Sequence, residues 1–372
     1  MKKGWQTKTI GDVCDVMNGG TPKTGVLEYW DGNHRWITPA EMGKRLSPYV
    51  GDTERKITDL GLRDSSARML PPNSVILSSR APIGHLVINT EPMGTNQGCK
   101  GLIPRSQIEH KFLYYYLSSI VDLLNSLGTG ATFKELSGGK LKEVTVPVPP
   151  LAEQQRIVGL LDEAFEGLAT AKANAEKNLR NARALFASHL QTVFTQGGPG
   201  WVTKTFGEVL EIRNGRNQLE VESPDGEFPI YGSAGKVMGM ATDYICEAGT
   251  TIIGRKGNIN SPIYADTRFW NVDTAFGLAS KAGMDSRFLY FFCLSYDFSA
   301  HNRGTTIPSL VKSELLNIPI PVPPPAEQQR IVGLLDSLQE ETQRLARFYE
   351  RKHAALEALK KSLLHQAFTG AL

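Results

Sequence analysis

Two stretches of the chain, residues 150–195 and 325–368, place apolar or small residues alternately three and four positions apart. The stripe consists of Ile157, Leu161, Ala164, Leu168, Ala171, Ala175, Leu179, Ala182 and Leu185/Phe186 in the first stretch, and of Ile331, Leu335, Leu338, Thr342, Leu345, Tyr349, Lys352, Leu356, Leu359 and Leu363 in the second. This spacing is typical of a helix in a coiled coil. At about 45 residues and about 1.5 Å per residue, each helix would be roughly 65–70 Å long.

The two stretches are copies of one another. The match begins at Pro147 and Pro321 and continues without a gap to Thr195 and Thr369, so the residues that it pairs are equivalent positions of two halves. A second match pairs residues 5–13 with residues 201–209, which lie further apart along the chain. The chain is therefore a duplicated half-protein in which the second globular part is shorter than the first.

The segment before each predicted helix alternates short apolar runs with Gly and Pro turn formers, which predicts a mixture of strands and loops. The predicted strands are Ser74–Ser78, Gly84–Ile88, Thr250–Ile253 and Ser261–Tyr264. Each segment also holds one helical patch, Lys111–Ile120 in the first and Ser286–Phe292 in the second. Each globular part is therefore expected to be a mixed α/β domain.

The predicted organisation is domain, helix, domain, helix, with boundaries at residues 1–146, 147–198, 199–320 and 321–372. A long helix with a narrow apolar stripe is not stable alone in water, so each needs a partner. We expect the two helices of one chain to pair antiparallel, which makes the fold α+β with a pseudo-two-fold axis. Pairing between two chains is the alternative.

Composition places the chain among ordinary globular proteins. Its 372 residues are 41% hydrophobic and 21% charged, with a net charge of +3. The four cysteines are far apart and form no metal-binding pattern, so we interpret them as buried reduced thiols of a cytoplasmic protein. No signal peptide and no run of about 18 apolar residues is present, which predicts no membrane association.

No catalytic signature is visible in the sequence. Phosphate-binding loops, dinucleotide fingerprints, zinc-protease and calcium-loop motifs are all missing, and the seven histidines show no metal-ligand spacing. We therefore predict no catalytic residues, no metal and no cofactor in this chain. A nuclease whose carboxylates meet only in the fold is the enzymatic alternative.

Two modules joined by helices of equal length suit a target with two separate half-sites, and double-stranded DNA is the obvious one. Arg, Asn and Gln can bond base edges, whereas Ser, Thr and Lys suit phosphates. The candidate DNA-binding residues are Lys23, Thr24, Trp36, Thr38, Arg80, Asn96, Gln97, Thr129, Thr132 and Lys134 in the first domain, and Arg213, Asn214, Arg216, Ser233, Arg255, Lys256, Asn258, Arg303, Thr305 and Thr306 in the second. The second domain holds 11 Lys/Arg against 13 Asp/Glu, so its DNA face must be a local patch.

The chain resembles the DNA-specificity subunit of a type I restriction-modification system over its whole length. The resemblance rests on the domain–helix–domain–helix plan and on the paired Pro-Pro-x-Ala-Glu-Gln-Gln-Arg-Ile-Val segments at 149–158 and 323–332. The motifs Gly19-Gly20-Thr21-Pro22, Tyr29-Trp30 and Trp36-Ile37-Thr38-Pro39 support it, as does Gly232-Ser233-Ala234-Gly235. It implies that each domain reads one half of a split DNA sequence and that the helices set the gap.

The resemblance also implies partners. Two methyltransferase subunits, with restriction subunits as further candidates, would carry S-adenosylmethionine, ATP and Mg²⁺, and this chain alone would be non-catalytic. We expect the helix starts to form the partner surface, namely Glu153, Gln154, Gln155, Arg156, Glu327, Gln328, Gln329 and Arg330. The competing hypotheses are a stand-alone adaptor that brings another effector to DNA, and a coiled-coil scaffold whose globular ends bind proteins or glycans.

Overall fold

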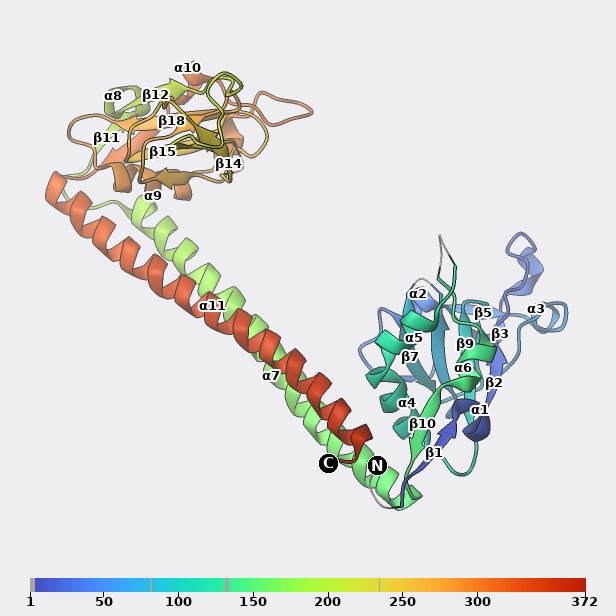
Figure 1. Ribbon diagram of the computed structural model, residues 1–372. Coiled ribbons are helices and arrows are strands. Elements are labelled where there is room, and N and C mark those ends of the chain that lie inside the picture. Colours follow the sequence, from blue (N-terminus) through green and yellow to red (C-terminus); the bar gives the residue numbers. More distant parts are fainter. Residues whose placement is uncertain (1–3, 81, 131–133, 234) are drawn as a thin grey trace. The chain divides into compact units, whose positions relative to one another are not determined.

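A computed structural model describes residues 4–80, 82–130, 134–233 and 235–372. The chain divides into two compact units, one formed by Met1–Asn174 with His353–Leu372 and the other by Ala175–Lys352. Each unit contains one globular region and a part of both long helices, α7 (Leu151–Gln196) and α11 (Pro325–Thr369) (Figure 1).

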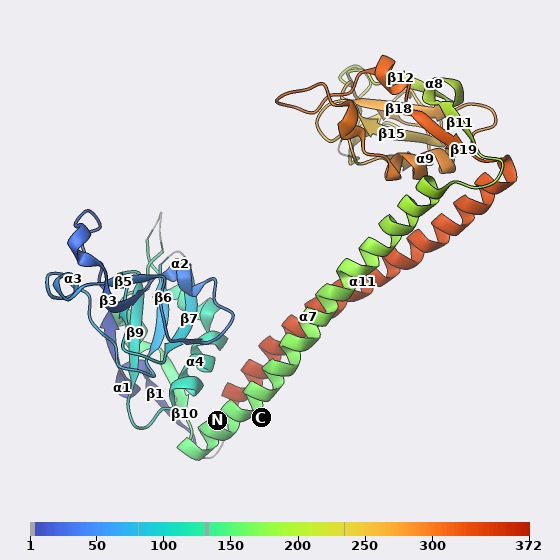
Figure 2. The same ribbon diagram turned by 180° about the vertical axis from the view of Figure 1, so that it is seen from behind.

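The first globular region is built on a five-stranded sheet in the order β2-β9-β6-β7-β4, beside a three-stranded sheet β5-β3-β8 and a two-stranded ribbon β1-β10. Its strands are β1 (Gln6–Thr9), β2 (Cys14–Asn18), β3 (Trp30–Ile37), β4 (Tyr49–Val50), β5 (Arg55–Ile57), β6 (Val75–Ser79), β7 (Ile83–Asn89), β8 (Gly94–Thr95), β9 (Cys99–Pro104) and β10 (Thr145–Val148). Its helices are α1 (Ile10–Val13), η1 (Leu27–Tyr29), α2 (Pro39–Met42), α3 (Asp59–Arg63), α4 (His110–Ser119), α5 (Val121–Leu127) and α6 (Gly138–Glu143). Helices α4 and α5 pack against β7 (Figure 2).

The second globular region repeats this plan with fewer strands. A four-stranded sheet has the order β12-β18-β15-β16, a three-stranded sheet the order β14-β13-β17, and β11 pairs with β19. Its strands are β11 (Val202–Thr205), β12 (Leu210–Asn214), β13 (Phe228–Tyr231), β14 (Val237–Ala241), β15 (Thr250–Gly254), β16 (Ile263–Ala265), β17 (Trp270–Asn271), β18 (Ala275–Ser280) and β19 (Pro319–Val322). Its helices are α8 (Phe206–Val209), α9 (Ser286–Ser295), η2 (Phe298–His301) and α10 (Lys312–Leu315).

The predicted elements are present in both regions. The two long helices begin and end within one residue of the predicted stretches, and the helical patches are α4 and α9. The runs predicted at 74–78, 84–88 and 250–253 are β6, β7 and β15, whereas the run at 261–264 becomes a strand only at Ile263. The predicted fold, two mixed α/β regions and two long helices packed together, is confirmed.

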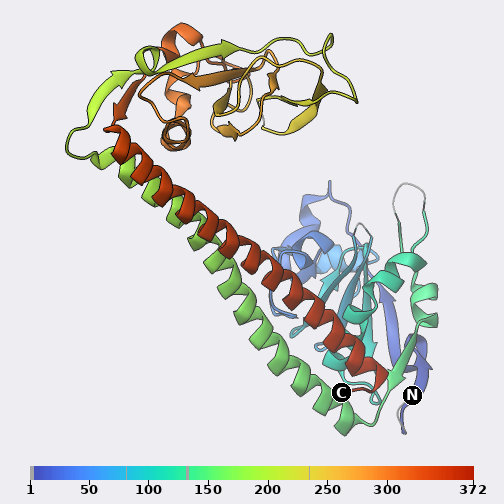
Figure 3. The same cartoon turned by 60° about the vertical axis from the view of Figure 1, so that its left-hand side comes forward.

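The two long helices run antiparallel. In the first unit the Arg156 guanidinium donates to the Leu372 carbonyl and Lys172 pairs with Glu357 at 2.7 Å, so the C-terminus lies beside the start of α7 (Figure 3). In the second unit Arg183 pairs with Glu350 at 2.9 Å. These ion pairs are exposed and contribute little to stability, so apolar packing holds the helices together.

The apolar seam of α11 departs from the predicted heptad spacing in the middle of the helix. Leu345 (38% exposed) and Leu359 (47%) lie on the surface, as does Lys352, whereas Ala346 and His353 are partly buried. A straight α-helix drifts by about 20° per heptad relative to a strict seven-residue repeat. The contact line therefore passes from the predicted positions to their neighbours, and the prediction was wrong at Leu345, Lys352 and Leu359.

This seam can be tested with two leucines of α11. We expect Leu335→Ala, at a fully buried position in the core of the second region, to lower the free energy of unfolding by about 2–5 kcal/mol. We expect Leu345→Ala to cost less than about 1 kcal/mol, because that side chain is exposed. Urea unfolding followed by circular dichroism measures both. Equal losses would contradict the seam described here and favour the heptad.

Both long helices complete the cores of the globular regions. The core of the first region includes Leu161 from the start of α7 and Leu364 from the end of α11. Phe368 packs edge-on against Phe112 and Tyr116 of α4, with both centroid distances 5.2 Å. The second region repeats these contacts with Phe194, the equivalent residue of α7, which packs against Phe288 at 5.2 Å and Phe292 at 5.5 Å of α9. The helices are therefore integral to each domain.

Candidate nucleic-acid interface

Three loops meet at one end of the main sheet in the second region. The loop after β15 is joined to residues 308–310, because Leu310 N donates to the Arg255 carbonyl at 2.8 Å and Gly257 N to the Pro308 carbonyl at 2.9 Å. The loop after β12 joins the start of β18, because Gly215 N donates to the Ala275 carbonyl at 3.2 Å. The fold thus brings together the sequence-predicted candidates of residues 214–216, 255–258 and 303–306.

The side chains of this loop cluster present positive charge around a hollow. A cavity of about 600 Å³ is lined by Asn214, Arg255, Phe276, Ser309, Leu310, Val311, Lys312, Ser313 and Leu316. The Arg255 guanidinium lies 5.8 Å from the Phe276 ring centroid, while Arg216, Lys256 and Asn258 are exposed. Gly257 has φ +84°, a left-handed backbone conformation that glycine adopts without strain. Ser233 is partly exposed beside the cluster.

The remaining candidates of the second region differ in whether their side chains are free to contact DNA or are bound by other groups of the protein. Arg303 is exposed but its Nε donates to both carboxylate oxygens of Glu314, at 2.9 and 3.0 Å, while Thr305 and Thr306 are exposed. Arg213 donates to the Ile245 carbonyl at 3.0 Å and lies 3.7 Å from Glu211. Arg213 therefore braces the sheet edge, and the exposed charge comes from the loops.

The first region builds the same loop arrangement. Leu136 N donates to the Ser79 carbonyl at 3.0 Å, and Thr129 exchanges backbone hydrogen bonds with Glu135. Counted back from the start of the duplicated motif, Leu136 and Thr129 stand at the places of Leu310 and Arg303, so these bonds repeat those of the second region. Thr129 and Lys134 are exposed, and the predicted Thr132 lies outside the described residues.

The Glu135 carboxylate lies between two cationic side chains, Arg80 and Lys100, at this end of the first region. Glu135 pairs with Arg80 at 2.8 Å and lies 3.8 Å from the Lys100 ammonium. Lys100 is buried, and that burial lowers the pKa of its ammonium group, an effect that Glu135 partly opposes. The sequence pattern did not single out Lys100, which stands on strand β9, or Glu135.

Other candidates of the first region lie in connecting loops. Asn96 donates to the Thr21 hydroxyl at 3.1 Å and accepts from Gly98 N at 2.8 Å, so its amide orders the loop. Gln97, Lys23 and Thr24 are exposed. Asn96 is therefore a bracing residue, while the other three have accessible side chains.

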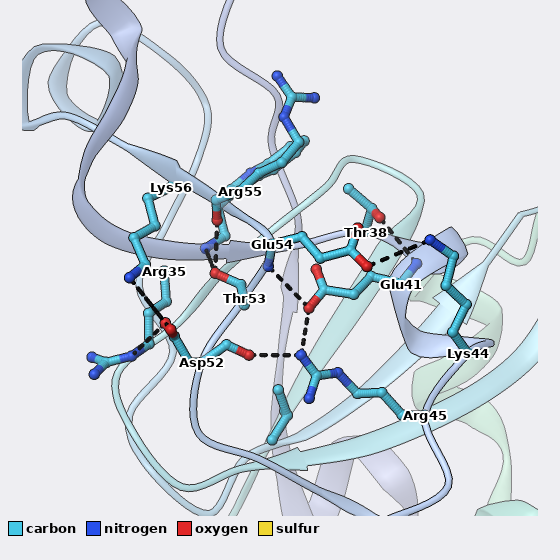
Figure 4. Close-up of polar contacts among 12 residues, drawn as sticks. Arg35, Thr38, Glu41, Lys44, Arg45, Asp52, Thr53, Glu54, Arg55 and Lys56 are labelled. Atoms are coloured by element: carbon cyan, nitrogen blue, oxygen red, sulfur yellow. Dashed lines mark hydrogen bonds and ion pairs between the residues drawn. The ribbon is translucent and has the colours of Figure 1, made fainter.

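Thr38 belongs to a polar network that holds helix α2 (Figure 4). Its hydroxyl accepts from Glu41 N at 3.2 Å, which caps the helix. The buried Glu41 carboxylate accepts from the Arg45 guanidinium and from Glu54 N, and Arg45 also donates to the Asp52 carbonyl at 2.7 Å. Thr38 thus has a structural task as a helix cap and remains partly exposed.

Trp36 is not on the surface, which corrects the expectation that it contacts DNA. It is 1% exposed, meets Trp30 edge-on at 5.2 Å, and donates from Nε1 to the Gly20 carbonyl at 2.9 Å. Burial of a large ring with a satisfied N–H is the favourable state for tryptophan. In the second region Trp270 donates from Nε1 to the Arg216 carbonyl at 3.1 Å, so a tryptophan anchors the corresponding loop there too.

Trp36 and Trp270 do not stand on corresponding strands. In the first region β3 and β8 pair in parallel with Trp36 opposite Gly94, and in the second β13 and β17 pair in parallel with Ile230 opposite Trp270. The large ring therefore comes from the first strand of the pair in one region and from the second strand in the other.

The helix starts divide into buried and exposed positions. Gln154 (0% exposed) and Gln328 (1%) point into their own domains, which removes them from the predicted partner surface. Gln155 and Gln329 are exposed. On the same turns Glu153 pairs with Arg156 at 2.7 Å and Glu327 with Arg330 at 2.8 Å, and both arginines are exposed.

Four exposed leucines extend this surface along the helices. Leu160 and Leu334 lie one turn after Arg156 and Arg330, and Leu185 and Leu359 form a second pair at equivalent positions of the two halves. The seam pattern had passed over the first pair and had assigned the second pair to the helix contact. Exposed leucines at equivalent places in both halves are the apolar positions that sequence reasoning missed.

No metal-binding cluster is found in the part of the chain that the structure describes. No group of three or more His, Cys, Asp or Glu residues there could hold a metal ion. The four cysteines are unpaired and buried, as predicted, and burial raises the pKa of Cys14, Cys99 and Cys246 to about 12. Among the described helices none is long and apolar enough to cross a membrane.

Comparison with known proteins decides the family. A family model described as the type I restriction modification DNA specificity domain matches residues 2–178 and 199–348. This chain belongs to that type I DNA-specificity family. The specificity subunit is the non-catalytic, DNA-recognising component of the type I restriction-modification complex.

Relatives in the type I DNA-specificity family match most of the chain. The specificity subunit of the type I restriction enzyme MjaIX from Methanocaldococcus jannaschii is 29% identical over 378 residues, covering 90% of this chain and 87% of the relative. The EcoR124I/EcoR124II specificity subunit from Escherichia coli is 34% identical over 163 residues, which is 42% of this chain and 40% of that protein.

Two solved structures share the fold of this family member. One comes from work on complex assembly and conformational transition of the type I R-M system, with a TM-score of 0.84 and 20% identity over 100% of this chain and 99% of that chain. The other is the HsdS subunit from Thermoanaerobacter tengcongensis, with a TM-score of 0.65 and 20% identity over 100% and 98%. At this identity they establish the fold.

Proposed function

We propose that each globular region reads one half of a bipartite double-stranded DNA site. The loops after β2 and β6, with Thr129 and Lys134 after α5, act in the first region, and the loops after β12 and β15, with residues 303–306 after η2, act in the second. One observation carries the proposal: the same loop cluster is built twice, with corresponding backbone hydrogen bonds in the two halves, on two long helices of nearly equal length. Two equivalent reading surfaces on a fixed spacer suit two half-sites at a fixed gap.

The positive side chains of each loop cluster supply the phosphate contacts, and the exposed amides supply base contacts. In the second region Arg216, Lys256 and Asn258 are exposed, and in the first Lys23, Gln97 and Lys134. Phosphate contacts give affinity without sequence preference, while Arg, Asn and Gln bonds to base edges give selectivity. The second region is slightly acidic overall, so its binding depends on this local patch.

The long helices would carry the partner subunits. Arg156 with Leu160, and Arg330 with Leu334, place a cation and an exposed leucine four residues apart in both halves. A repeated patch fits two copies of one partner, and we assign it to two methyltransferase subunits. S-adenosylmethionine, ATP and Mg²⁺ would be bound by the methyltransferase and restriction subunits. We place the two DNA-recognition domains at residues 1–146 and 199–320. The helical segments are residues 147–198 and 321–372.

The proposed function is tested by co-expressing the chain with methyltransferase subunits of its system and mapping methylated bases on a random DNA library. A bipartite motif with one preferred gap is expected. Recovery of no methyltransferase subunit, together with no DNA binding by the purified assembly, would contradict the proposal.

Selectivity at the two halves should be separable by substitution. We expect Arg303→Ala with Thr305→Ala to lower discrimination at the second domain's half-site by about tenfold, because a bidentate base contact contributes about 1–3 kcal/mol. The other half-site should be read as before. Thr129→Ala, at the position corresponding to Arg303, is the matched variant and should affect only the first domain's half. Methylation rates on substrates mutated in one half at a time measure both. An equal loss at both halves would refute modular reading.

A further inference from the structure

The buried glutamines of the repeated motif have a task that the proposed function does not assign. We propose that Gln154 and Gln328 are positioning residues, each of which locks one recognition domain at a fixed angle on the long helix that follows it and so keeps the half-site gap selective. The inference rests on the proposed bipartite reading. The motif in which both residues stand also contains an exposed glutamine, Gln155 or Gln329, directly beside each one.

Each buried amide joins its helix to a loop of the domain. The Gln154 side-chain oxygen accepts from Glu109 N at 2.8 Å, and its nitrogen donates to the Gln107 carbonyl at 3.0 Å and to the Pro149 carbonyl at 2.8 Å. Glu109 is the N-cap of α4, so the amide ties the first turn of α7 to the start of α4. Every bond is made to a backbone group.

The second unit repeats these three bonds. The Gln328 side-chain oxygen accepts from Asp285 N at 2.7 Å, and its nitrogen donates to the Gly283 carbonyl at 3.0 Å and to the Pro323 carbonyl at 2.9 Å. Asp285 is the N-cap of α9. Two regions with divergent interiors therefore use the same bond set at the same junction.

Only glutamine can satisfy this junction. Its amide offers one acceptor oxygen and two N–H donors, and all three are used here. Glutamate has the same shape but no donor in its ionised form, and methionine has the length without strong hydrogen-bonding groups. Asparagine is one methylene shorter. Any of these changes leaves buried backbone groups without partners, which favours a shifted domain in which water reaches them.

Two further contacts make the lock directional. Eight residues after each glutamine, Asp162 accepts from Lys111 at 2.7 Å and Asp336 accepts from Arg287 Nε at 2.9 Å. The other long helix adds Phe368 in the first unit and Phe194 in the second. Two points about 12 Å apart on one helix and a third on its neighbour define an orientation, whereas a single contact would leave a hinge.

A small tilt at this junction would change the reading of the gap. A domain of this size has a radius of gyration of about 15 Å, so its far loops lie roughly 20 Å or more from the junction. At that distance a tilt of about 10° moves a loop by about 3.5 Å, close to the spacing of one base pair. Loss of these hydrogen bonds should therefore lower the selectivity for gap length, while the contacts to each half-site remain.

The test uses the chain assembled with its methyltransferase subunits and carrying Gln154→Met or Gln328→Met. Ala152→Met and Ala326→Met, at exposed equivalent positions of the same helix turns, are the matched controls. Methylation rates are measured on sites whose gap is one base pair shorter or longer than the preferred one. We expect each buried-site variant to raise the rate at altered gaps about tenfold relative to the preferred gap, with unchanged half-site sequence, and the controls to behave as the unchanged chain.

Hydrogen exchange reports the lock directly. The Glu109 amide in Gln154→Met, and the Asp285 amide in Gln328→Met, should exchange at least tenfold faster. Gap selectivity that matches the controls, or loss of half-site selectivity together with gap selectivity, would overturn the inference. If the methionine variants do not fold, Gln154→Glu and Gln328→Glu keep the shape and carry the same expectations. No bipartite methylation by the unchanged chain would defeat the proposed function, whereas unaltered exchange at Glu109 and Asp285 would defeat the lock alone.

Discussion

Insertion of four residues into each long helix, between Asn174 and Ala175 in α7 and between Lys352 and His353 in α11, is expected to lengthen the preferred gap by about two base pairs. Four residues add about 6 Å to a helix, and successive base pairs are about 3.4 Å apart. Because the helices run antiparallel, both must lengthen together for the seam to persist. Long-read methylation mapping of cells that express the variant with its partners measures the gap.

Two further insertions sharpen this experiment. Seven residues in both helices match two turns closely, add about 10 Å, and should lengthen the gap by roughly three base pairs with less loss of activity. Four residues in α7 alone should misalign Lys172 with Glu357 or Arg183 with Glu350 and abolish methylation. An unchanged gap in the active double-insertion variants would show that the helices do not set it.

Removal of the last turns of α11 is expected to destabilise the N-terminal region, although the two are far apart in sequence. Leu364 and Ala367 are buried in that core, and Phe368 packs on Phe112 and Tyr116. Truncation before Leu364 would expose this apolar surface. We expect a loss of several kcal/mol in the free energy of unfolding of the first region, since one large-to-small core change costs about 2–5 kcal/mol.

A pair of point variants provides the control. Phe368→Ala should lower the stability of the first region by about 2–4 kcal/mol, and Phe194→Ala, at the corresponding place, should do the same to the second region only. Thermal unfolding with hydrogen exchange resolved by region separates the two effects. Melting of both regions together in each variant would contradict the packing described here.

The long helices could be predicted closely because their signal is repeated over many turns. The repeated helical stretches placed the ends within one residue. The heptad spacing failed at Leu345, Lys352 and Leu359, where a straight helix turns away from a seven-residue repeat. Strands β6, β7 and β15 followed from Gly and Pro punctuation, whereas most of the other strands were not predicted. The pairing of β1 with β10 had no local signal, since it joins residues 6–9 to residues 145–148.

The candidate interface residues were predictable where glycine marks a loop. They were not predictable where burial determines whether a side chain reaches the surface. The cluster at residues 255–258 was found because Gly257 stands between polar residues. Trp36 and Gln154 have residue types that suit an interface, and only the fold shows that both are interior. Glu135 and Lys100 were not predicted, because they are far apart in sequence and only the fold brings the carboxylate within 3.8 Å of the ammonium group.

The tryptophan that anchors the loops after β2 and β12 constrains how the two regions can exchange sequence. In the first region a Cβ on Gly94 would lie 3.2 Å from the Trp36 ring, so a larger residue there would press on the ring. In the second region Ile230 faces Trp270. An alignment of the two regions therefore pairs Trp36 with Ile230. It hides the fact that a tryptophan Nε1 donates to a loop carbonyl in both regions. A recombinant that inherits the first strand from one region and the second strand from the other would carry either two bulky rings or none. Viable chimaeras should have crossover points outside the segment that contains both strands.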